Sequence, residues 1–131
     1  MKKYTYVARF EKDQGEESYC VTFPDLQGAI TGGFTLEEAI FMAHDCLGGY
    51  LWTMEDEGDK LPIPSKLSAF EHNADNVFYS LISIDLAEYR RLISEKPVKK
   101  TLYIPKRLND EAEAKGVNFS QVLREALAKI V

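Results

Sequence analysis

The sequence predicts an α+β protein in two parts, an N-terminal domain over residues 1–94 and a C-terminal unit over residues 98–131, joined by a linker over 95–97. Short alternating strands open the chain and precede a long amphipathic helix, an order typical of a small sheet covered by helices. A second strand pattern, followed by two short helical patterns, fills the last third. The charge also changes there. Residues 97–131 hold seven Lys and Arg against four acids, a net +3, whereas the first 96 hold nine against 17, a net −8.

The composition is that of an ordinary soluble globular protein, with 45% apolar and 28% charged residues. We find no apolar run long enough to span a bilayer and no apolar signal-peptide core at the start, so a cytoplasmic protein without membrane contact is expected. Cys20 and Cys46 have neither the density of a disulfide framework nor the spacing of metal ligands. The sequence therefore predicts no metal and no cofactor.

Three strands are expected before the first helix, over residues 4–10, 18–23 and 29–32. Thr35 then opens a helix through a capping box with Glu38. An apolar stripe at steps of three and four residues follows: Leu36, Ile40, Ala43, Leu47, Tyr50 and Met54.

The pair Gly48-Gly49 interrupts this helix, at a cost of about 1 kcal/mol each relative to Ala. It predicts either a bend or a strand packed closely against the helix. The run over 77–84 is apolar on both sides, which predicts a central or doubly covered strand. A second capping signature at Asp85 then opens a short helix. The N-terminal domain is thus β-β-β-α-β with a trailing helix.

The strand predicted over 98–105 has two different faces. Leu102 and Ile104 share one face, whereas Lys99, Thr101 and Tyr103 share the other. Pro105 follows at a position that suits a first helical turn. The whole strand–helix–helix unit is too small to bury a core alone, because domains below roughly 40 residues seldom fold by themselves. We therefore expect a homodimer formed through this unit.

A strand–helix–helix unit with a basic strand face is the pattern of a ribbon-helix-helix module, whose paired strands fit the major groove. Outward strand residues would meet base edges, and N–H groups at the start of the last helix would hold a phosphate. Arg107 is a further candidate for a backbone contact. The candidate DNA-binding residues are Lys99, Lys100, Thr101, Tyr103, Lys106, Asn118, Phe119 and Ser120. The alternative interpretation is a dimerisation arm whose charges are only solvated.

Candidates for catalysis are few. His44 on the long helix and His72 in a loop have no Ser, Cys or metal constellation near them in sequence, so we expect a protein that is not an enzyme. Asp25 is interpreted as a turn-forming residue in preference to a general base. The acidic run over 55–59 is interpreted as a solvated helix end in preference to a weak cation site.

The residues Val-Thr-Phe-Pro-Asp-Leu-Gln-Gly over 21–28, with the pattern Thr-x-Gly-x-Thr-x-x-Glu-Ala over 31–39, resemble the N-terminal domain of HicB antitoxins. Residues 100–105 and 116–123 resemble the ribbon-helix-helix tail of one HicB branch. The resemblance implies a partial RNase-H-like fold without that enzyme's carboxylate set. It also implies a partner, HicA, a small basic toxin that cleaves mRNA.

By the same resemblance, the protein would mask the toxin and repress its own operon by binding operator DNA. Phe23, Asp25 and Leu26 in the resembling turn are our candidates for toxin contact. Two alternatives stay open. One is a metal-dependent ribonuclease that retains RNase-H-like activity, which would be lost on mutating Asp25 or nearby acids. The other is a standalone ribbon-helix-helix transcriptional regulator with a ligand-sensing first domain.

Overall fold

The computed structural model describes residues 3–70 and 74–131 and divides the chain into two compact units, Met1–Lys96 and Pro97–Val131. The predicted loop histidine, His72, lies outside the described residues.

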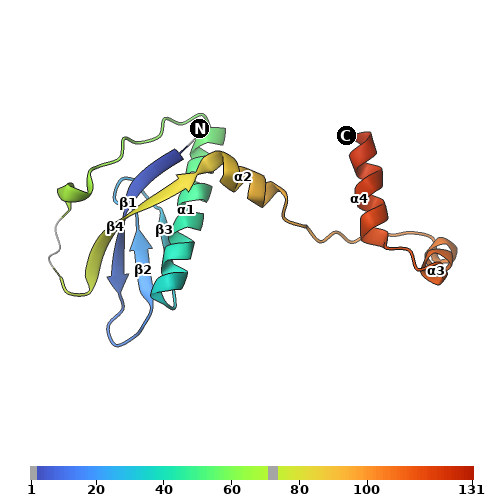
Figure 1. The fold of residues 1–131 in the computed structure, drawn as a ribbon, viewed down its shortest axis with the longest axis horizontal. Coiled ribbons are helices and arrows are strands. Elements are labelled where there is room, and N and C mark those ends of the chain that lie inside the picture. The colour runs from blue at the N-terminus through green and yellow to red at the C-terminus, as the bar shows by residue number, and fades with distance from the viewer. Residues whose placement is uncertain (1–2, 71–73) are drawn as a thin grey trace. The chain divides into compact units, whose positions relative to one another are not determined.

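The first unit contains a four-stranded antiparallel sheet in the order β3-β2-β1-β4 (Figure 1). Its strands are β1 Lys3–Lys12, β2 Tyr19–Thr22, β3 Ile30–Gly33 and β4 Val77–Asp85. The predicted α+β class is confirmed. Of the two alternatives predicted for β4, a central strand or one covered on both faces, the central position is wrong, because β4 forms an edge of the sheet. Its two-sided apolar pattern has a local reason: Phe78 stacks on Phe10 at 4.8 Å in one direction, and Tyr79 stacks on Phe70 of the preceding loop.

Helix α1, Leu36–Asp56, lies along one face of this sheet (Figure 1). The Thr35 hydroxyl accepts from the Glu38 N–H as predicted, at 3.1 Å. The predicted apolar stripe is only partly right, because Leu36 and Ile40 stay exposed. The buried positions are Ala39, Ala43, Leu47, Gly48 and Leu51.

Close approach of strand and helix explains this shift toward small residues. A β-carbon at Gly33 of β3 would lie 2.4 Å from the backbone nitrogen of Ala39. Small residues are therefore required where the start of α1 crosses the sheet. The larger side chains of Leu36 and Ile40 are turned away from this contact.

Helix α2, Leu86–Ser94, begins at the predicted cap, where Asp85 accepts from the Glu88 N–H. It packs against α1 through Tyr89, whose ring covers Gly48. The prediction of a bend or a closely packed strand at Gly48-Gly49 is therefore wrong. Helix α1 is continuous, and the missing side chain makes room for an aromatic ring of another helix.

The segment between α1 and β4 includes a short 3₁₀ helix, η1 Leu67–Ala69. Two sets of hydrogen bonds fasten this segment to β1 and to the turn after β2. The Tyr6 hydroxyl donates to the Pro62 carbonyl at 2.6 Å. The Ser65 N–H and hydroxyl both donate to the Asp25 carboxylate at 2.7 Å.

The second unit contains α3 Lys106–Ala114 and α4 Phe119–Ile130. Gly116 ends α3 with a φ of 69°, the left-handed conformation expected after a helix. The strand predicted over 98–105 is absent from the single chain as described, where residues 97–105 have no regular secondary structure. A strand needs a neighbouring strand to hydrogen-bond with, and this unit holds no other.

Candidate partner-binding and DNA-binding surfaces

The turn after β2 carries the predicted partner-contact residues, and most of their surface is inside the fold. Phe23 is 3% exposed and Leu26 is 1% exposed, so both are core residues. Asp25 is half-buried and is occupied by the two hydrogen bonds from Ser65. The outward part of this turn consists of Pro24, Gln27 and Gly28.

The same turn is held rigidly from beneath. The Leu26 N–H donates to the Phe23 carbonyl at 3.0 Å, and the Tyr50 hydroxyl of α1 donates to the Gln27 carbonyl at 2.8 Å. Gly28 has a φ of 83°, a left-handed conformation that favours glycine. The geometry of the turn therefore explains its sequence pattern. Phe23 and Leu26 anchor the turn in the core, and Asp25 fastens the long loop through Ser65.

A groove of about 460 Å³ lies between this turn, the start of β3 and the second half of α1. Ile30 and Met54 contribute apolar wall, and Glu57 and Asp59 contribute acidic groups. Cys46 also faces it, and burial raises the pKa of this thiol. The groove thus combines apolar surface with negative charge.

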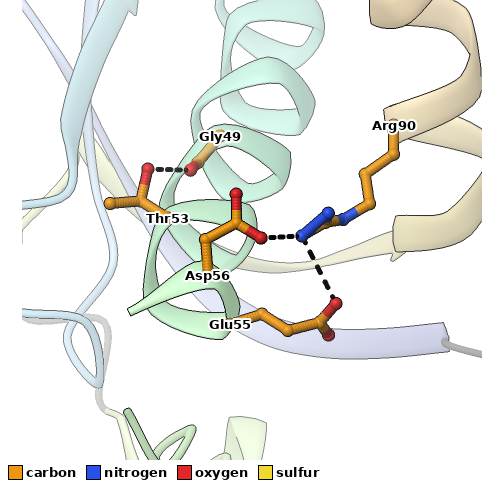
Figure 2. Close-up of polar contacts among 5 residues, drawn as sticks. All are labelled: Gly49, Thr53, Glu55, Asp56 and Arg90. Atoms are coloured by element: carbon orange, nitrogen blue, oxygen red, sulfur yellow. Dashed lines mark hydrogen bonds and ion pairs between the residues drawn. The ribbon is translucent and has the colours of Figure 1, made fainter. Parts of the chain in front are cut away.

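The acidic end of α1 is largely solvated, as interpreted from the sequence: Asp56, Glu57 and Asp59 are exposed, and Glu55 is half-buried. It also takes part in an ion-pair contact with α2. Figure 2 shows the Arg90 guanidinium reaching from α2 to Asp56 and Glu55. The guanidinium also lies over the Trp52 ring, 4.9 Å from its centroid. Arg90 therefore holds α2 on α1 by two ion pairs and a cation–π contact.

Tyr89 makes the second connection between these helices. Its hydroxyl donates to the Asp45 carboxylate at 3.1 Å, and its ring meets Trp52 edge-on at 6.1 Å. Burial, and then the hydrogen bond to Asp45, raise the pKa of Tyr89 to about 12. This tyrosine is a structural group that remains protonated at neutral pH.

His44 has a structural contact of the same kind. Its Nδ1 lies 2.9 Å from the carbonyl oxygen of Ser83 on β4, so the tautomer with a proton on Nδ1 donates to that edge strand. Over residues 3–70 and 74–131, we find no group of three or more His, Cys, Asp or Glu side chains arranged to hold a metal. Within the same residues, no helix is long and apolar enough to cross a membrane.

The candidate DNA-binding residues all lie at the surface of the second unit, and Tyr103 is 98% exposed. Asn118 caps α4 by accepting from the Gln121 N–H at 3.1 Å. The N–H groups of Phe119 and Ser120 belong to the first turn, where a helix offers no internal acceptor. Lys106 pairs with Asp110 at 2.7 Å, a surface pair that costs little to exchange for a phosphate.

The second unit also contains an apolar groove of about 620 Å³. Alternate residues of the extended segment, Lys100, Leu102 and Ile104, line one side of it. Helices α3 and α4 supply the opposite side, including Leu108, Ala112, Phe119, Val122, Leu123 and Ala126. The face predicted to be apolar is thus turned toward the helices even though the segment is not a strand.

Sequence reasoning missed four residues that shape the first unit's surface: Tyr89, Arg90, Phe34 and Phe41. The glycine pair was the available signal for Tyr89, since it marks a place where a neighbour comes close. Phe41 and Gly48 are seven residues apart in α1 and share a second face of the helix, which the prediction of one buried face did not include. Phe34 stands directly before the N-cap residue Thr35.

Comparisons with known proteins bear on the whole chain. The model of a family described as HicB-like antitoxin of bacterial toxin-antitoxin system matches residues 6–127. Antitoxin HicB 2 of Photorhabdus laumondii is 31% identical over 105 residues, which are 73% of this chain and 74% of that protein. A chain of a toxin–antitoxin complex from Streptococcus pneumoniae is 32% identical, with a TM-score of 0.59, and the match covers 98% of this chain and 99% of that chain. The Burkholderia pseudomallei antitoxin HicB shares the fold at 21% identity, with a TM-score of 0.55 and 98% of both chains covered.

Proposed function

Since the chain belongs to the family of HicB-like antitoxins of bacterial toxin–antitoxin systems, we propose that its first unit masks a HicA-type toxin. We propose further that its second unit binds operator DNA as a dimer and represses the operon. The first unit would be a partial RNase-H-like fold, an assignment supported by its β-β-β-α order followed by β4.

The observation that carries the DNA-binding part is the lack of a core in the second unit. None of residues 97–131, all of which the structure describes, is buried. The large apolar side chains left exposed are Val98, Leu102, Tyr103, Ile104, Leu108, Phe119, Val122, Leu123, Leu127, Ile130 and Val131. Soluble proteins seldom leave so many large apolar side chains uncovered in so short a segment.

A second copy of the same unit would supply the missing half. Two extended segments running antiparallel would satisfy each other's backbone groups, which explains why residues 98–105 form no strand alone. Such pairing leaves Lys99, Thr101 and Tyr103 on the outer face of a two-stranded ribbon, the element that the major groove admits.

The toxin-masking part is supported by charge. The first unit carries the net −8 of residues 1–96, and a basic ribonuclease presents the opposite potential. Opposite potentials accelerate encounter and disfavour wrong partners. The related chain in the Streptococcus pneumoniae structure was solved in a toxin–antitoxin complex.

Co-expression with the small basic protein encoded beside this gene tests the masking. We expect the pair to co-purify and the antitoxin to relieve growth arrest by that protein. If the chain neither binds it nor restores growth, the antitoxin function is refuted. Retained DNA binding in that case would favour the standalone regulator.

Mobility-shift titration with the DNA upstream of the operon tests the second activity. Binding should rise steeply with protein concentration, because monomers must pair before they bind. Substitution Leu123→Glu should abolish both self-association and DNA binding while leaving toxin binding unchanged. Binding of a strict monomer would overturn the dimer model.

A further inference from the structure

The outer face of α1 bears a stripe that is covered along only half of its length. Phe41 and Gly48 are seven residues apart in α1, which is about two helical turns, so they lie on one face of the helix. Phe34 precedes the N-cap residue Thr35, just before the first turn. Tyr89 of α2 covers Gly48. Phe41 is 69% exposed and Phe34 is 80% exposed.

Helix α2 covers only the C-terminal half of the stripe. Its contacts with α1 fall at Asp45, Gly48 and Trp52, as well as at the acidic end of the helix. Phe41 lies one turn before Asp45, just beyond the last of these contacts. A helix face that is already used for packing at one end is therefore left bare at the other.

Phe34 is held close to the first turn of α1. It precedes the N-cap residue Thr35, and its N–H donates to the Glu38 carboxylate at 3.3 Å. The position of its backbone is thus set by the cap. Two large exposed aromatic side chains, one just before α1 and one in its second turn, are of the type enriched at protein interfaces.

The charge of α1 identifies the kind of protein that fits this face. The helix contains Glu37, Glu38, Asp45, Glu55 and Asp56 and has no Lys or Arg. A second copy docked face to face would bring its own carboxylates against these, and like charges oppose association. A basic surface with an apolar recess fits instead.

We propose that Phe34 and Phe41 are the anchors of the toxin-docking surface. This inference rests on the proposed function above. The partner's recess takes the two rings. A lysine or arginine of the partner pairs with Glu37, which stands three residues after Phe34 and four before Phe41. Glu38 remains occupied by its cap contact with the Phe34 N–H. The buried residues Phe23 and Leu26 then act from beneath, by fixing the turn that leads into β3 and α1.

The test compares full-length variants for binding to the small basic protein encoded beside the gene. Titration calorimetry should show the double variant Phe34→Ser/Phe41→Ser binding about 100-fold more weakly, because truncated anchors of this type rank among interface hot spots. Glu37→Lys should weaken binding and steepen its loss with added salt. The matched control is Ile63→Ser, an equally exposed apolar residue in the long loop, which should bind as the unchanged protein does.

Three further readouts separate the outcomes. Both rings are exposed, so the double variant should retain its melting temperature and its operator binding. Unchanged affinity for the basic protein would overturn the proposed surface while leaving the antitoxin function intact. A shift of the free antitoxin to a smaller assembly would also overturn it, because a second copy would then be the occupant. Absence of binding by the unchanged protein would refute the antitoxin function and this surface together.

Discussion

A β-carbon at Gly48 of α1 would lie 2.7 Å from ring atoms of Tyr89 on α2. The ring therefore occupies the volume that any other residue at this position would fill. This contact sets the distance between the two helices, and α2 is the last element of the first unit before the linker. The packing of Tyr89 on Gly48 thus determines where the chain leaves the first unit.

We predict that Gly48→Ala destabilises the first unit, although alanine is the better helix former by about 1 kcal/mol. The added methyl group meets the body of the ring, so α2 must shift. Gly49→Ala is the matched control, because its β-carbon would meet only the Tyr89 hydroxyl, at an ordinary 3.6 Å. Chemical denaturation should show the midpoint falling for the first variant and holding or rising for the second. A stabilised Gly48→Ala protein would contradict the packing.

Arg90→Ala should cost about 1–2 kcal/mol of unfolding free energy, since the side chain loses two ion pairs and its place over Trp52. Arg91 provides the comparison. It pairs with Glu88 and Glu95 on the open surface, where such pairs contribute little, so Arg91→Ala should change stability by less than about 0.5 kcal/mol. Equal losses from both variants would show that Arg90 is not an anchor.

The raised pKa of Tyr89 predicts a loss of stability at high pH. The unfolded chain ionises this phenol near the ordinary tyrosine pKa of 10.0, whereas the folded protein keeps the proton until about pH 12. Stability contributed by the neutral phenol is therefore complete below pH 10 and declines between pH 10 and 12, by at most about 1.4 kcal/mol per pH unit. The pKa of Tyr6 is raised as well, so the contribution of Tyr89 is isolated as the difference in unfolding free energy between the unchanged protein and Tyr89→Phe. That difference should shrink over the same interval, and a constant difference would contradict the assignment.

The sequence predicted the strands and helix starts of the first unit because their signals are local. Thr35 and Asp85 cap their helices as expected, since a cap is decided within four residues. The two-sided apolar pattern of β4 depended instead on a loop residue, Phe70, that stacks on Tyr79. Alternation alone cannot report which distant segment covers a face.

The candidate site residues show the same difference between local signals and contacts made by distant segments. Phe23, Asp25 and Leu26 were selected from a resembling motif, and the structure gives each a place in the fold: two in the core and one holding Ser65. Phe34 and Phe41 belong to no such motif and became visible only once α2 was seen to cover half of α1. In the second unit the faces of 98–105 were predictable from alternation, whereas its strand depends on a partner chain.

The outer face of residues 98–105 supplies the last prediction. Lys99→Ala or Thr101→Ala should weaken operator binding by about 1–3 kcal/mol, the usual value of a base contact, because both side chains stand away from the groove that Leu102 and Ile104 line. Toxin affinity should be unchanged, since the proposed toxin-docking surface lies in the first unit. Lys60→Ala, the loss of an exposed lysine from the first unit, is the charge-matched control and should leave DNA affinity unaltered. Fluorescence anisotropy at several salt concentrations measures the effect, and sedimentation of the same samples reports the dimer. If Lys99→Ala and Thr101→Ala dissociate the dimer, these residues build the ribbon and do not read the DNA.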